Sequence, residues 1–186
     1  NDTATTEIYT LSLHDALPIS PFVNYYAGHH WYVKDTSDPR VALEMKITGA
    51  VAERRSFADC LTEGTLPHKI LLMMEPADCE WAERELQALF PALNVVRSAP
   101  HLLEIMDASV NKASGIEVML KHFGLEASDA LSFGDNYNDL EMLRYTGASV
   151  AMGNAPQPVK AAAGEVTTSN EEDGIYVYLS EHHLIG

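Results

Sequence analysis

From Asp107 to the end of the chain, short apolar segments alternate with segments of helical period. The clearest helical stripe contains four apolar residues: Ile116, Met119, Leu120 and Phe123. Gly124 follows this stripe and predicts the end of the helix. The remaining elements are expected in this order: a strand at residues 130–133, a helix from 140 to 147, strands at 149–152 and 166–168, and a helix over 175–179. This alternation predicts an α/β architecture with a parallel, doubly wound, Rossmann-like sheet.

Residues 21–107 have a different order of elements. The pattern predicts a hairpin of residues 22–26 with 31–33, a helix over 39–45, a strand at 68–74, a helix from about 78 to 90, and strands at 93–96 and 102–106. A small α+β unit with an antiparallel sheet covered on one face is therefore expected. We predict three regions: a tail at 1–20, the α+β unit at 21–107 and the α/β unit at 108–186.

The first twenty residues show no sustained period and resemble the conceptual translation of a sequencing adapter. Under this interpretation His14 and Asp15 carry no chemistry, and the natural N-terminal part of the protein is absent from the chain. The alternative is a genuine extended arm, with a short strand over residues 7–13 ended by Pro18.

The charge balance excludes several classes of partner. The chain has 12 Lys+Arg against 27 Asp+Glu, a formal net charge of −15. Such a chain repels nucleic acid and anionic membrane surfaces, and no apolar run reaches the roughly 18 residues of a membrane span. Cys60 and Cys79 form no Cys-x-x-Cys motif, which is typical of a protein of the reducing cytoplasm. Nothing in the sequence indicates an oligomeric state.

Candidate chemistry lies where the strand at 130–133 ends. Gly134 permits a sharp turn there, and Asp135, Asn138 and Asp139 follow it. Carboxylate and amide oxygens at the carboxyl end of a parallel strand suit Mg²⁺, although the same residues are also common helix caps. Lys112 stands at a helix start, where the helix dipole does not favour a cation, and such a lysine can serve an anionic ligand or simply be solvated.

Residues 67–180 resemble the Cof-type branch of the haloacid-dehalogenase-like hydrolases. The resemblance is carried by five segments: PHKILLM, VVRSAPHLLEIM, VNKASGIEVMLKHFGL, LSFGDNYNDLEMLRYTGASVAMGNA and TTSNEEDGI. It implies a bacterial, cytoplasmic, Mg²⁺-dependent phosphatase of small phosphorylated metabolites such as sugar phosphates. It also implies that residues 21–107 form a type IIB cap and that residues 108–186 form the C-terminal half of the catalytic core.

The resemblance also implies roles for individual residues. Lys112 would steady the nucleophile and the phosphate, Asp135 would bind Mg²⁺, and Asp139 would be a supporting carboxylate beside the metal. Asn138 would contact the phosphate. Two further asparagines, in loops that border the site, would contact the substrate: Asn154 and Asn170.

The sequence departs from the family in one respect. Enzymes of this family carry an Asp-x-Asp pair at the end of the first core strand, and no Asp-x-Asp occurs among the 186 residues. The Ser/Thr phosphate-binding motif is not located either. We therefore expect a fragment of an enzyme, inactive as it stands. The alternative is a non-catalytic protein that binds phosphorylated ligands and has lost the nucleophile.

Two other groups of residues have two interpretations each, and a third group has one. Hairpin aromatics can line a substrate pocket or form the core of the unit: Tyr25, Tyr26, Trp31 and Tyr32. His29 and His30 can bind a metal or lie in a solvated turn, and the turn is favoured. The acidic residues 171–173 are expected at a solvated helix start.

Overall fold

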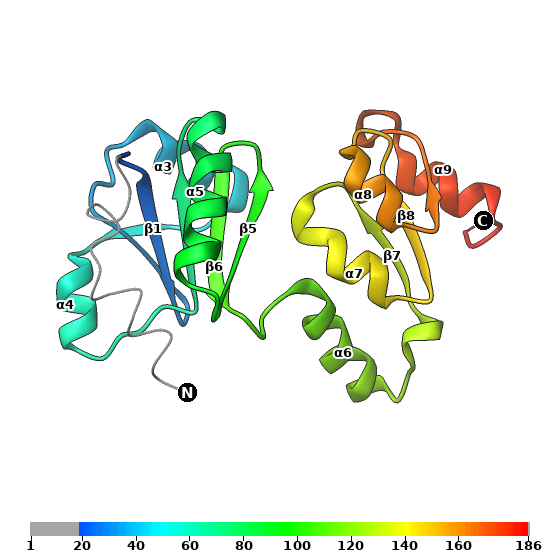
Figure 1. Cartoon of the computed structure of the whole chain (residues 1–186), viewed down its shortest axis with the longest axis horizontal. Helices are drawn as coiled ribbons and strands as arrows, with labels where there is room; N and C mark the ends of the chain where they lie inside the picture. Colours follow the sequence, from blue (N-terminus) through cyan, green and yellow to red (C-terminus); the bar gives the residue numbers. More distant parts are fainter. Residues whose placement is uncertain (1–18, 186) are drawn as a thin grey trace. The chain divides into compact units, whose positions relative to one another are not determined.

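The computed structural model describes residues 19–185, so the predictions about the tail and about His14 and Asp15 lie outside the described residues (Figure 1). The fold is a mixed α/β fold with two sheets. The chain divides into two compact units, the first ending at Ala108 and the second beginning at Ser109. Among residues 19–185, no helix combines the length and the apolar character needed to cross a bilayer.

The first unit contains a six-stranded sheet in the order β3-β2-β1-β4-β6-β5. The strands are β1 (Phe22–Ala27), β2 (His30–Val33), β3 (Ala52–Arg54), β4 (Lys69–Met73), β5 (Leu93–Ala99) and β6 (Leu102–Asp107). The predicted hairpin and the three later strands are confirmed. Strand β3 was not predicted, because it is short and polar, and its pairing with β2 is parallel whereas the other pairs are antiparallel.

The helices of this unit are α3 (Pro39–Thr48), α4 (Phe57–Thr62) and α5 (Pro76–Leu89), and they cover both faces of the sheet. On β1, Phe22 packs with α3, whereas the next residue, Val23, packs with the core beneath α5. Neighbouring residues of a strand point to opposite faces, so α3 and α5 lie on opposite sides. Figure 1 shows α5 in front of the strands. The prediction of a sheet covered on one face was therefore wrong, because the hairpin carries large apolar side chains on both faces.

The hairpin aromatics belong to the core. Tyr25, Trp31 and Tyr32 are buried, with 1%, 3% and 4% of their surface exposed. The indole nitrogen of Trp31 donates a 3.0 Å hydrogen bond to the side chain of Asn24, which is itself fully buried. Tyr26 is half-buried and stacks on Trp31, and burial is the main cause that raises its pKa to about 12. The core interpretation is confirmed for the three buried rings.

The second unit has a parallel sheet in the order β7-β8-β9, with β7 (Leu131–Gly134), β8 (Ala148–Ala151) and β9 (Glu165–Val166). Its helices are α6 (Lys112–Phe123), α7 (Leu140–Tyr145), α8 (Gln157–Ala162) and α9 (Gly174–Glu181). The predicted order of strands and helices is confirmed, and α8 is an addition that was not predicted. Gly124 caps α6 with a φ of 68°, as its position predicted.

The predicted apolar stripe of α6 is only partly buried. Leu120 is buried, whereas Met119 and Phe123 are 54% and 64% exposed. Val118, on the same helix, is 67% exposed. In the part of the chain that the structure describes, β7 pairs with β8 and with no other strand. Within residues 19–185, the second unit therefore has a sheet edge with no paired strand, here called the open edge, and apolar helical surface.

Candidate active site

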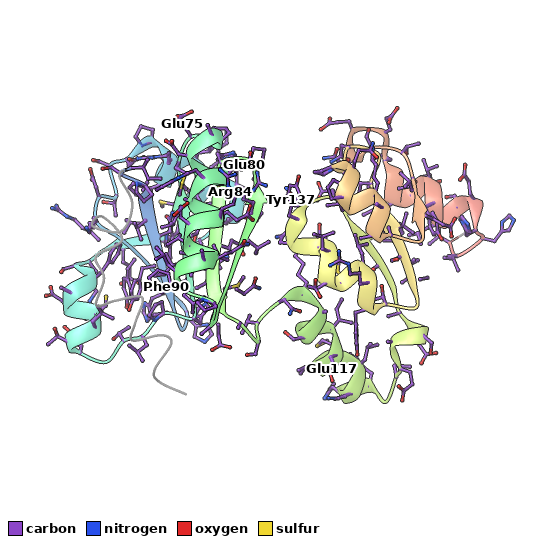
Figure 2. The ribbon with its side chains drawn as sticks, viewed as in Figure 1. Glu75, Glu80, Arg84, Phe90, Glu117 and Tyr137 are labelled. Carbon is purple, nitrogen blue, oxygen red and sulfur yellow. The ribbon has the colours of Figure 1, made fainter. Side chains whose placement is uncertain are left out.

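Three loops follow the carboxyl ends of the three parallel strands of the second unit. Residues 135–139 follow β7 and include a short 3-10 turn, η2 (Tyr137–Asp139), before α7; Tyr137 is labelled in Figure 2. Asn154 follows β8, and Asn170 opens a second 3-10 turn, η3 (Asn170–Glu172), after β9. Because parallel strands end at the same edge of a sheet, these polar residues gather there.

Asp139 is the buried centre of this edge, with 3% of its surface exposed. Its Oδ2 accepts hydrogen bonds from the backbone amides of Asp135 and Asn136, at 2.8 and 2.9 Å. Its Oδ1 forms an ion pair with Nζ of Lys112, 27 residues earlier in the chain. Both oxygens of Asp139 are thus committed to the protein, and the carboxylate holds the turn and the lysine together.

Gly134 allows Asp139 to sit this close to the strand end. A Cβ at position 134 would lie 2.6 Å from Cβ of Asp139 and 3.1 Å from Cδ1 of Leu143. Real Cβ atoms do not approach neighbours at 2.6 Å, so any larger residue would displace the carboxylate. The glycine of this motif is required by packing, and not by an unusual backbone angle.

Lys112 is the first residue of α6, and its position is fixed by the helix cap. Oδ1 of Asn111 accepts a 2.9 Å hydrogen bond from the backbone amide of Ser114. In return, Oγ of Ser114 accepts a 3.1 Å hydrogen bond from the backbone amide of Asn111. This reciprocal cap holds the first turn in one geometry. The Lys112 side chain is 48% exposed, so its ammonium group can contact an anion in solvent while it remains paired with Asp139.

A chain of hydrogen bonds joins the other predicted residues. Nδ2 of Asn154 donates to Oδ2 of Asp135 at 3.2 Å, and the backbone amide of Asn170 donates to Oδ1 of Asn154 at 3.0 Å. Nζ of Lys160, on α8, donates to the carbonyl oxygen of Gly153 at 2.5 Å. Lys160 was not singled out from the sequence, because its partner is a backbone atom that no motif reveals.

The structure therefore brings together five of the six predicted site residues through direct contacts. Asn138 lies in the same turn, half-buried, and its side chain bonds to no other residue within 19–185. The histidines lie elsewhere: His30 pairs with Glu53 at 2.7 Å in the first unit, and His29 is exposed. The solvated-turn interpretation of this pair is supported.

The acidic stretch after β9 is also exposed, as expected. The Glu172 carboxylate accepts hydrogen bonds from the hydroxyl and the amide of Ser169, at 2.7 and 3.1 Å, and these bonds lower its pKa, the hydroxyl more than the amide. This carboxylate caps the short turn η3, and it belongs to the local structure of the loop.

The donor set at the strand ends can hold Mg²⁺ in a limited way. Among the described residues, no group of three or more His, Cys, Asp or Glu side chains is assembled as a ready metal cage. Asp135 is half-exposed, and its Oδ1 accepts no hydrogen bond from residues 19–185. Mg²⁺ in proteins commonly keeps several waters and binds one or two carboxylates together with substrate phosphate. The site fits that pattern, with Asp135 as the available ligand.

The second unit thus defines a class: a parallel α/β domain whose strand ends gather a lysine, two aspartates and asparagine side chains. The chain belongs to the haloacid dehalogenase-like hydrolases, because the sequence model of that family matches residues 9–179.

Three relatives define this similarity further. A protein of Haemophilus influenzae, whose phosphatase name is provisional, is 37% identical over 159 residues, 86% of this chain and 59% of its own length. The 5-amino-6-(5-phospho-D-ribitylamino)uracil phosphatase YitU of Bacillus subtilis is 42% identical over 82 residues, 44% of this chain and 30% of its own. A solved sugar phosphatase of subclass IIB shares the fold, with a TM-score of 0.78 at 24% identity, covering 100% of this chain and 68% of that protein. The chain thus spans about three fifths of the first relative.

Proposed function

We propose that this chain is part of a Mg²⁺-dependent phosphatase that hydrolyses phosphate monoesters of small metabolites. The observation that carries the proposal is the buried Asp139 carboxylate, which joins Lys112 to the turn that presents Asp135. Phosphoryl transfer depends on positioning and on neutralising negative charge, and this arrangement offers a fixed cation beside a hard oxygen ligand. Residues 21–107 are then the type IIB cap, and residues 108–186 the second half of a doubly wound core.

The residues of this chain have distinct roles in the proposed reaction. Lys112 binds the phosphoryl oxygens and keeps the nucleophile aligned, and Asp139 is a positioning residue that orients Lys112. Asp135 would hold Mg²⁺, and the ion would supply positive charge that neutralises the phosphoryl group. Asn154 orients the Asp135 carboxylate through its 3.2 Å hydrogen bond. The attacking carboxylate would come from an Asp-x-Asp strand outside the 186 residues.

The proposed substrate class follows from the relatives. One is named for a ribityl phosphate and one for sugar phosphates, so a small phosphorylated polyol or sugar is proposed here. The net charge of −15 supports a requirement for a cation with such substrates. The cytoplasm is the proposed compartment: Cys60 and Cys79 are free and buried, and burial raises the pKa of the Cys79 thiol to about 11, which keeps it protonated.

A second candidate, a non-catalytic protein that binds phosphorylated ligands, is favoured by the absence of Asp-x-Asp. Both candidates predict that the chain as printed releases no phosphate from p-nitrophenyl phosphate with Mg²⁺, above a control without protein. They differ for the protein extended upstream along its natural reading frame, here termed the extended protein. Hydrolysis by the extended protein supports the phosphatase. A natural start codon near Pro21, together with no hydrolysis by the protein that begins there, supports the binding protein.

The metal role of Asp135 can be tested on the chain itself. Mn²⁺, a paramagnetic substitute for Mg²⁺, is expected to broaden the amide NMR signals of residues 134–139 and 153–154 first. Asp135→Asn should raise the Mn²⁺ concentration that produces this broadening at least tenfold, because one of very few carboxylate ligands is lost. Asp129→Asn is the matched control, since Asp129 precedes the opposite end of β7. Equal broadening in both variants, or broadening that begins elsewhere, would contradict the assignment.

A further inference from the structure

A second group of cations lines a separate cavity, within the first unit. The cavity has a volume of about 430 Å³ and is lined by four residues: Lys34, Arg54, Arg55 and Ser56. They come from the loop after β2, from the end of β3 and from the residues that lead into α4. The parallel register of β2 and β3 sets Val33 beside Arg54, and the amide of Arg55 donates to the carbonyl oxygen of Val33 at 2.9 Å. The backbone itself therefore brings the cations together.

Arg55 is held in place by its neighbours. Its Nη1 donates to the hydroxyl of the buried Tyr32 at 3.3 Å, its guanidinium lies 5.2 Å from the centre of that ring, and its Nη2 pairs with Glu63. Nζ of Lys34 lies 5.6 Å from the ring centre of Phe57. An ordered guanidinium presents its donors to an anion at a smaller entropic cost than a free side chain.

The charge of this cavity contrasts with the rest of the chain. It gathers three of the 12 Lys+Arg of a chain that has 27 Asp+Glu. Lys34 and Arg54 form no ion pair with a carboxylate in residues 19–185, so neither ammonium nor guanidinium has a direct carboxylate partner there. Two carboxylates lie close enough to compete with an anion: Glu63, which pairs with Arg55, and Asp35, which interacts with the charge of Arg54. The Asp35 carboxylate is engaged by the hydroxyl and amide of Ser37, at 2.7 and 2.9 Å. Those bonds, and to a smaller extent the charge of Arg54, lower the pKa of Asp35.

We propose that Lys34, Arg54, Arg55 and Ser56 form a binding site for the phosphate group of a small molecule, termed here the Arg54 pocket. Two cations without a direct carboxylate partner match a phosphate dianion, the Arg55 fork adds directed donors, and the Ser56 hydroxyl adds a neutral one. A volume near 430 Å³ exceeds what a phosphate fills, so the pocket also admits part of the molecule that carries it. The proposal does not depend on the phosphatase reaction, because its residues differ from Lys112 and Asp135.

The test is a titration of the 186-residue chain with inorganic phosphate at constant ionic strength, followed by amide NMR. Signals of residues 33–37 and 54–57 are expected to shift and saturate, whereas an equal charge of chloride should leave them unmoved. Arg54→Gln should weaken this binding roughly tenfold, because a charge-assisted hydrogen bond is lost. Lys34→Gln is a second variant, and both side chains are exposed, so folding is preserved. Arg84→Gln is the control, because Arg84 is exposed on α5 (Figure 2) and is not among the residues that line the pocket.

A parallel titration with glucose 6-phosphate identifies the source of the phosphate. Tighter binding of the ester than of inorganic phosphate assigns the pocket to a phosphorylated metabolite, and equal affinity assigns it to the free anion; each supports the proposal. Signals of residues 112 and 134–139 report phosphate at the candidate active site separately. The proposal is overturned if Arg54→Gln and Arg84→Gln weaken binding equally, or if chloride reproduces the shifts.

Discussion

Lys112→Ala is expected to lower kcat/KM of the extended protein by about 10²–10³, and by nearly the same factor for every phosphorylated substrate. Each substrate presents the same phosphoryl group to the Lys112 ammonium, so the loss does not depend on the rest of the molecule. The variant also leaves the buried Asp139 carboxylate without its cation, which loosens the turn that carries Asp135. Steady-state hydrolysis of three unrelated phosphate esters measures the effect.

Lys121→Ala is the matched control for this prediction. Lys121 lies on the same helix and is 73% exposed, and among residues 19–185 its ion pair is with Glu117, four residues earlier. Such an exposed pair contributes little to stability, and we expect little change in rate. A Lys112→Ala variant that lost activity toward one ester and kept it toward another would show that Lys112 selects substrates and does not serve the common phosphoryl group.

Gly134→Ala is expected to destabilise the second unit by about 1–3 kcal/mol, because the added methyl would lie 2.6 Å from Cβ of Asp139. Movement of Asp139 would break its bonds to Lys112 and to the amides of Asp135 and Asn136, so Mn²⁺ binding should weaken together with stability. Urea unfolding followed by methyl NMR of Leu143 and Val150 measures the change. Trp31 and Trp81 both lie in the first unit, so tryptophan fluorescence follows that unit separately.

Gly115→Ala is the same chemical change as Gly134→Ala, but we expect it to stabilise the second unit. Gly115 lies inside α6, and a Cβ there would meet no heavy atom within 4 Å. At an open helical position, alanine in place of glycine stabilises a protein by about 0.5–1 kcal/mol, because it lowers the conformational entropy of the unfolded chain. If both glycine substitutions stabilised the unit, the close contact between Gly134 and Asp139 would not be present in solution.

The order of strands and helices could be predicted because apolar period and glycine position are local signals. The helix end at Gly124 is one example, and the strand that ends at Gly134 is another. Strand β3 escaped prediction because it is short and polar, and its neighbour β2 holds it in place. Helix α4 escaped prediction because six residues are too few to show a helical period, and the core side chain Cys60 holds it in place. The two-sided cover of the first sheet was missed for a related reason: aromatics on both faces of a strand require two layers of helices.

The candidate site was predictable in its members and not in its connections. The turn motif could be identified from its spacing, and Lys112 from its place at a helix start and from the family resemblance. The sequence did not indicate that both oxygens of Asp139 are committed to the protein. Nor did it indicate that Asn154 links Asp135 to the Asn170 backbone. The two amide contacts of Asp139 are local, but the other three contacts join residues 16 to 27 positions apart, and such pairings arise from the sheet that brings the loops together. Lys160 was missed because it bonds to a carbonyl oxygen.

The open edge of β7 has a direction, and that direction determines how another strand can join it. Every pairing in this sheet is parallel, and β7 runs from Leu131 toward Gly134. A strand added in the same sense would enter beside Leu131 and finish beside Gly134, so its last residues would arrive next to Asp135. The direction of this edge thus places the C-terminal end of an added parallel strand, and any carboxylate on it, at the end of the sheet where Lys112 and Asp135 lie.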